Sequence, residues 1–109
     1  MMSHIQLLRE ELSIPQILRV YGKQFRQIRK QYSDELDGRC AIGVIMSYFG
    51  WYGKHDSDSS DSLQIALHVL KDAGIRSGIV IKLNNSGKTF DEIADYIDLN
   101  KKLTNDKHN

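Results

Sequence analysis

Apolar residues recur with helical spacing in the last third of the chain. Thr89 followed by Glu92 is a capping box, in which each side chain accepts a hydrogen bond from the other residue's backbone N–H. Gly87 stands just before it, where a chain reversal needs positive φ. The spacing predicts an amphipathic helix that starts after Thr89, with an apolar stripe of Phe90, Ile93, Ala94 and Ile97.

A second periodic stretch lies near the N-terminus. Ser13 is a predicted helix cap, with Pro15 in the first turn and Gln16 at the capping-box position. The apolar spacing then predicts one helix continuing to about Tyr32, with a possible kink at Gly22. Its apolar seam consists of Leu18, Tyr21, Phe25, Ile28 and Tyr32.

The remaining segments complete a helical pattern. Residues 40–49 are apolar on every side, which favours a buried central helix in which Gly43 lets a neighbouring helix approach closely. A further helix, capped near position 60, is expected to end at Gly74. Residues 79–83 are β-branched but lack an evident pairing strand, so we expect a short helix there, with an extended segment as the alternative.

These elements predict an all-α fold. We expect one compact domain of about five short helices over residues 1–103, the first of them capped by Ser3 and running to about Leu12. Residues 104–109 are expected to form a flexible polar tail.

Composition narrows the class of protein. The chain has 109 residues, a net charge of +1 and one cysteine, which indicates a single domain without a disulfide framework. Its start lacks a signal pattern, and its longest apolar stretch is shorter than the roughly 20 residues that cross a bilayer. We therefore expect a cytoplasmic protein that has no membrane partner.

Two segments together resemble a family of small uncharacterised proteins from phages, actinobacteria and archaea. The family combines a Cys-Ala-x-Gly helix start with an Asn-Asp-x-Gly-Thr/Ser-Phe-x-Glu-Ile-Ala segment. Here these are Cys40-Ala41-Ile42-Gly43 and residues 84–94, and the resemblance covers about residues 38–98. Asn85 departs from the pattern, since Asp is usual there. The resemblance implies a compact, mainly helical fold and no particular activity.

Two surfaces on the helix predicted after Ser13 are candidate binding sites. The apolar seam of Leu18, Tyr21, Phe25, Ile28 and Tyr32 predicts a protein partner or a homo-oligomer, because its length suits a partner as well as the protein's own core. A basic stripe on the same helix predicts, as the alternative, contacts with the phosphates of a nucleic acid. That stripe consists of Arg19, Lys23, Arg26, Arg29 and Lys30.

Other candidates carry less weight. Residues 92–100 resemble the first helix and turn of a helix-turn-helix, but the residues that follow supply little for a recognition helix. Cys40 beside Arg39 at a helix start could favour a thiolate, with His55 or His68 as a base, although a buried structural cysteine explains it as well.

Neither a phosphate loop nor a metal site is predicted. Gly87-Lys88-Thr89 lacks the earlier glycine of a P-loop, since Lys82 stands there. The Asp56, Asp58 and Asp61 spacing lacks the glycine and glutamate of a calcium loop, and no histidine spacing fits zinc. Trp51 and Tyr52 are expected to close the core, with an exposed aromatic anchor as the alternative. We therefore expect a small helical interaction module that uses no cofactor, and the sequence leans against an enzyme.

Overall fold

The structure is a computed structural model that describes residues 12–108. Within that range the chain forms five α-helices, one 3₁₀ turn and a parallel sheet of two very short strands. In chain order they are α2 (Ile14–Val20), η1 (Tyr21–Gln24), β1 (Arg26–Gln27), β2 (Gly38–Arg39), α3 (Ala41–Tyr48), α4 (Ser57–Asp72), α5 (Ser77–Asn85) and α6 (Phe90–His108). The mainly helical fold predicted from the sequence is confirmed, while the helix expected over residues 3–12 lies outside the described residues except for Leu12.

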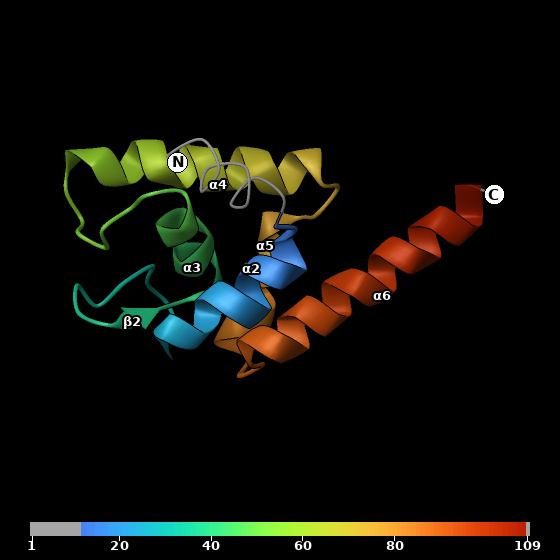
Figure 1. Ribbon diagram of the computed structural model, residues 1–109, viewed down its shortest axis with the longest axis horizontal. Helices are drawn as coiled ribbons and strands as arrows, with labels where there is room; N and C mark the ends of the chain where they lie inside the picture. The colour runs from blue at the N-terminus through green and yellow to red at the C-terminus, as the bar shows by residue number, and fades with distance from the viewer. Residues whose placement is uncertain (1–11, 109) are drawn as a thin grey trace, which may run out of the picture.

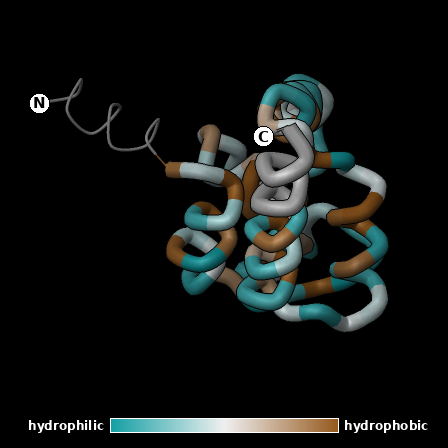
Figure 2. The backbone as a smooth tube through the Cα atoms, turned by 90° about the vertical axis from the view of Figure 1, so that its right-hand side faces the viewer, coloured by the Kyte–Doolittle hydropathy of each residue, from teal (hydrophilic) through white to brown (hydrophobic). Residues whose placement is uncertain are grey.

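α3 is the centre of the molecule. All eight of its residues are buried, as expected for a segment that is apolar on every side. It packs against α2, α4 and α5, and α2 lies along the first part of α6 (Figure 1). Hydrophobic and hydrophilic residues alternate in short stretches along the backbone (Figure 2), and buried apolar residues of α2, α4, α5 and α6 form one core cluster with α3.

The prediction of one long helix after Ser13 is wrong in its extent. The capping box of Ser13 and Gln16 is present, but α2 ends at Val20 and the chain becomes extended from Phe25. At Gly22 the chain lies against the ring of Phe90, and a Cβ there would come within 2.9 Å of it. The following residues leave the helix because their backbone groups find partners elsewhere in the fold.

Those partners lie on β2 and α5. The N–H of Arg26 donates to the carbonyl of Asp37, and the N–H of Ile28 donates to the carbonyl of Arg39. Asn84, at 1% exposure near the end of α5, donates to the carbonyl of Ile28 at 2.8 Å. Its Oδ1 accepts from Gln27 and from the N–H of Ala41. One buried amide therefore joins the extended segment to the start of α3 and the end of α5.

The backbone of Tyr32 packs directly on α3. A Cβ on Gly43 would overlap the carbonyl oxygen of Tyr32, so only glycine fits there. The close approach predicted at Gly43 is present, but the neighbour is an irregular segment and not a helix.

The helices of the second half follow the sequence more closely. Residues 79–83 lie in α5 and are helical, and α4 begins at Ser57, slightly before the predicted cap near position 60. Gly74 follows α4 with a φ of +76°. The Thr89 and Glu92 capping box forms, and the stripe of Phe90, Ile93, Ala94 and Ile97 is buried. α6 is helical through His108 and projects beyond the other helices (Figure 1).

Candidate protein-interaction site

A buried arginine lies at one end of the molecule. Arg39, at 5% exposure, comes directly before α3 on β2. Its guanidinium lies 4.7 Å from the ring centroid of Phe25 and 5.6 Å from that of Trp51, both within cation–π range. Burial lowers the pKa of this guanidinium, but an arginine remains charged at neutral pH. A charge in this position has to be satisfied by hydrogen bonds.

Arg39 makes those hydrogen bonds to two separate loops. Nη1 donates to the carbonyl of Leu36 at 3.0 Å, and Nη2 donates to the carbonyl of Tyr52 at 3.4 Å. Further donations go to the Gly38 carbonyl and to the hydroxyls of Ser33 and Ser47. We call residues 33–38 and 50–56 the loop pair, since this one side chain fixes both.

Additional contacts stiffen the loop pair. Asp34 Oδ1 accepts from the backbone N–H groups of Leu36 and Gly38, both at 2.9 Å, which closes the first loop. Glu35 accepts from the N–H of His55 at 2.8 Å, a second link between the loops. A Cβ on Gly53 would overlap the Arg39 guanidinium, and φ at this glycine is +89°. The conformation of both loops is therefore strongly determined.

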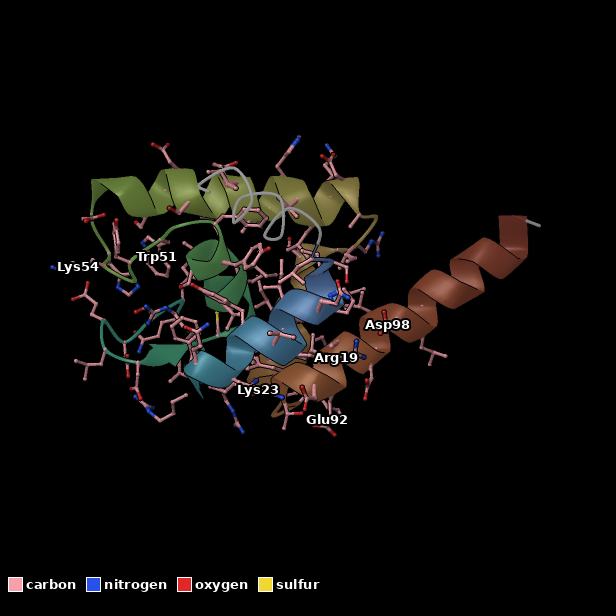
Figure 3. The ribbon with its side chains drawn as sticks, in the orientation of Figure 1. Arg19, Lys23, Trp51, Lys54, Glu92 and Asp98 are labelled. Atoms are coloured by element: carbon pink, nitrogen blue, oxygen red, sulfur yellow. The ribbon has the colours of Figure 1, made fainter. Side chains whose placement is uncertain are left out.

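The loop pair exposes two large apolar side chains. Tyr52 is 90% exposed and Leu36 is 77% exposed, the highest values among the large apolar residues described. Trp51, by contrast, is buried, and its Nε1 donates to the carbonyl of Lys54. A hollow of about 310 Å³ is lined by Trp51, Tyr52, Lys54 and Asp56. Figure 3 shows Trp51 and Lys54 on the loop at this end of the molecule. Of the two expectations for the aromatic pair, core closure is confirmed for Trp51, whereas Tyr52 is exposed.

The predicted apolar seam does not form one surface. Leu18 is in the core at 1% exposure, and Tyr21, Phe25 and Tyr32 are partly buried against it. Ile28 is half-buried and belongs to the extended segment after β1. Because α2 ends at Val20, these five residues do not share a helix face, and most of their apolar area packs within the fold.

The predicted basic stripe is also broken up. Arg19 pairs with Asp95 and Asp98 of α6, at 2.6 and 2.8 Å (Figure 3). Arg26 pairs with Asp34 and Asp37. Lys23 lies on η1, while Arg29 and Lys30 follow β1. One helix face carrying all five cations is therefore a wrong prediction.

Some of these cations do come together at another place. The N–H of Lys30 donates to Asn85 Oδ1 at 3.0 Å, and the Arg29 guanidinium lies against Gly87. Gln27 donates to the carbonyl of Lys88 at 2.7 Å. Arg29, Lys30 and Lys88 are all exposed, and the Arg29 guanidinium and the backbones of Lys30 and Lys88 lie at or against the turn before α6.

α6 also tests the helix-turn-helix resemblance. It continues as one helix through residues 98–100, where such a motif would turn. Asp98 lies within α6, where it pairs with Arg19 of α2, and it does not occupy a turn.

The structure opposes the thiolate interpretation of Cys40. The residue caps α3, and its Sγ accepts from the N–H of Gly43 at 3.4 Å. Burial raises the pKa of this thiol, although the backbone N–H groups of Gly43 and Ile42 act in the opposite direction. The candidate bases have other neighbours, since His55 lies against Trp51 and Glu35 and His68 pairs with Asp72. The part of the chain that is described contains no group of three or more metal-ligating side chains.

Sequence reasoning does not identify Leu36 as part of this site, and it treats Arg39 only as the neighbour of Cys40. A partial signal exists for Arg39, because a charged residue just ahead of a fully apolar helix must be either exposed or extensively hydrogen-bonded.

The comparisons with known proteins add no family. No family model, curated protein or solved structure matches the chain. No helix among the described residues is both long and apolar enough to cross a membrane.

Proposed function

We propose that this protein is a small cytoplasmic interaction module that binds a protein partner, or a second copy of itself, through the loop pair. The observation that carries the proposal is the exposure of Tyr52 and Leu36 on loops that Arg39 holds in place. Binding and catalytic residues often lie on loops that a rigid scaffold positions. Tyrosine in particular is enriched among the residues that dominate binding energy.

The rigidity of the loops supports the same function. A surface loses affinity when its side chains and loops must become ordered on binding. Here the loops are already fixed by the Arg39 contacts, by the Asp34 turn and by the Glu35 link to His55. The ordering cost is therefore small at the place where the apolar side chains are exposed.

The test is a double variant, Leu36→Ser with Tyr52→Ser. Both side chains point to solvent, so the variant should keep the helical circular-dichroism spectrum and the unfolding midpoint of the wild type. We expect it to lose either concentration-dependent mass in light scattering or capture of a partner from cell extract. A matched control is Ile65→Ser with Leu99→Ser, which removes two exposed apolar side chains elsewhere. Equal association of the wild type and the loop-pair variant would overturn the proposal.

A second candidate is binding of a nucleic-acid backbone at the turn before α6. It is supported by the exposed residues Arg29, Lys30 and Lys88, whose backbones or side chains lie at this turn. This turn takes the place of the predicted helical stripe as the candidate basic surface. Each phosphate contact releases counterions, so binding would weaken steeply with salt. Fluorescence anisotropy with labelled duplex and single-stranded DNA, and with Arg29→Glu and Lys88→Glu, tests it. Binding that is insensitive to salt or to these reversals would exclude this surface.

A further inference from the structure

A second surface lies at the other end of α4. The loop pair leads into the first turn of this helix, whereas a groove of about 760 Å³ lies at its last turns and at the start of α5. α4 has 16 residues and is about 24 Å long, and the groove takes its lining from the last part of this helix, from Leu67 onwards. Whatever binds at one end can therefore be tested separately from the other.

The groove combines an apolar floor with a cationic rim. Leu67, Ile75 and Ile79 supply half-buried apolar side chains. Lys71, Arg76 and Lys82 are exposed around them. Among the described residues that line the groove there is no carboxylate, so the cations are not neutralised within it.

The start of α5 adds to this positive character. The cap residue Arg76 makes no side-chain hydrogen bond to the first turn. The N–H groups of Ile79 and Val80 donate to the Arg76 carbonyl. The N–H groups of Ser77 and Gly78 precede these bonds and so have no acceptor within the helix. Both of these residues line the groove. Free N–H groups at a helix start favour negative charge.

The surface is open at Gly78, in the first turn of α5. The residue is exposed, and a Cβ there would meet no atom within 4 Å. A larger side chain can therefore be introduced at this position without a clash, which makes it suitable for a variant.

We propose that the groove binds an acidic, apolar peptide segment of a partner protein. The apolar floor matches large aliphatic or aromatic side chains, and the cationic rim and free N–H groups match carboxylates between them. A nucleic acid fits less well, because stacking on aromatic side chains is its usual apolar contact and the groove is lined by none. The proposal does not rest on the loop pair.

The experiment follows the backbone amide signals of the whole protein by NMR while synthetic peptides are added. The main probe is a ten-residue peptide in which Asp and Glu alternate with Leu and Phe. One control peptide carries Lys in place of the acids, and another carries Ser in place of the apolar residues. We expect only the main probe to shift the amides of Leu67, Gly74 and residues 77–79 in a saturable way.

Protein variants locate the binding. Lys71→Glu should weaken binding of the acidic peptide by about fivefold, whereas Lys23→Glu, the same charge change away from both the groove and the loop pair, should change it less than twofold. Gly78→Leu fills the groove, and we expect it to abolish the shifts while preserving the helical spectrum. Gly78→Ala, a smaller change in the same place, is the folding control.

Three results would overturn the proposal. These are the absence of groove shifts with the acidic peptide, equal shifts with the basic or serine peptide, and larger groove shifts with duplex DNA than with the acidic peptide. None of them bears on the loop pair, whose test uses different variants and a different readout.

Discussion

The segment between α2 and α3 and the helical half from α4 to α6 satisfy their backbone groups in different ways. In the helical half, the N–H and C=O groups bond within each helix, and caps such as Thr89 complete the ends. In residues 25–40 the backbone groups bond to one another across the segment and to side chains, including Asn84 and Asn85 far along the chain. Arg39 has a corresponding role for the loop pair.

This difference determines how each region responds to substitution. A helix loses one bond or one cap when a side chain changes, and the neighbouring turns remain. The irregular segment depends on a few buried polar side chains, and loss of any of them leaves several groups without partners. Buried unsatisfied groups are costly. We therefore expect the largest losses of stability from Arg39 and Asn84 and smaller ones from the helix caps.

The largest effect is expected at Arg39. Arg39→Met keeps much of the side-chain volume but removes the donors to Ser33, Ser47 and the loop carbonyls. We expect the free energy of unfolding to fall by about 3 kcal/mol or more, measured by urea denaturation.

Arg26→Met is the matched control for this prediction. Arg26 is exposed and its partners Asp34 and Asp37 are partly buried and exposed, so its loss should cost clearly less than the loss of Arg39. Similar losses at Arg26 and Arg39 would show that burial does not set the difference.

The next effect is expected at Asn84. Asn84→Asp preserves shape and the acceptor for Gln27 and Ala41, but it turns the donor facing the Ile28 carbonyl into an oxygen. We expect a loss of about 2–3 kcal/mol at pH 7 from a buried charge and a lost bond. Burial raises the folded pKa of the new carboxyl above its unfolded pKa, so the loss from the buried charge should shrink as pH falls through the folded pKa. It should be gone below the unfolded pKa, where the group is protonated in both states.

Asn85→Asp is the control at the neighbouring position. Asn85 is only half-buried, and its Oδ1 accepts from the N–H of Lys30, a role that a carboxylate also performs. We expect a change within about 0.5 kcal/mol. A loss as large as that of Asn84→Asp would contradict the distinction between the two amides.

A smaller effect is expected in the helical half. Thr89→Ala removes the hydroxyl that accepts from the N–H of Glu92, at 3.1 Å in the folded protein. The expected loss is about 1 kcal/mol, measured by the same denaturation. Thr89→Ser keeps the acceptor and should lose little. A loss above that of Arg39→Met would reverse the order proposed for the two regions.

The same difference explains how much of the fold the sequence could predict. Capping boxes at Ser13 and Thr89, the apolar run of α3 and the stop at Gly74 are local signals, and each was read correctly. The extent of the helix after Ser13 was not, because Phe25, Ile28 and Tyr32 keep a helical spacing by coincidence. Their conformation is set by pairing with β2 and by Asn84, which lies far along the chain.

The candidate site was predicted only in part. An exposed aromatic anchor was one of two expectations for Trp51 and Tyr52, and in the structure Trp51 is buried whereas Tyr52 is exposed. Nothing local indicates that Leu36 would share this end of the molecule, because the link passes through the guanidinium of Arg39. The prediction of a basic stripe was wrong for the same reason as the prediction of the long helix, since α2 ends at Val20.

The smallest effect is expected when the pH is lowered, and it concerns the turn that Asp34 holds in the first loop. The backbone N–H groups of Leu36 and Gly38, together with nearby Arg26, lower the pKa of Asp34 below its ordinary value, although partial burial acts in the opposite direction. Because the folded pKa lies below the unfolded one, the stabilisation is present above about pH 4 and is lost as pH falls through the folded pKa. An NMR titration should show Asp34 titrating at low pH while the Leu36 amide shifts with it. Asp34→Asn keeps an acceptor for Leu36 and should make that amide insensitive to pH. An Asp34 that titrates at or above the ordinary value would mean that the turn of the first loop is not held by its carboxylate, and that the loop pair depends on Arg39 alone.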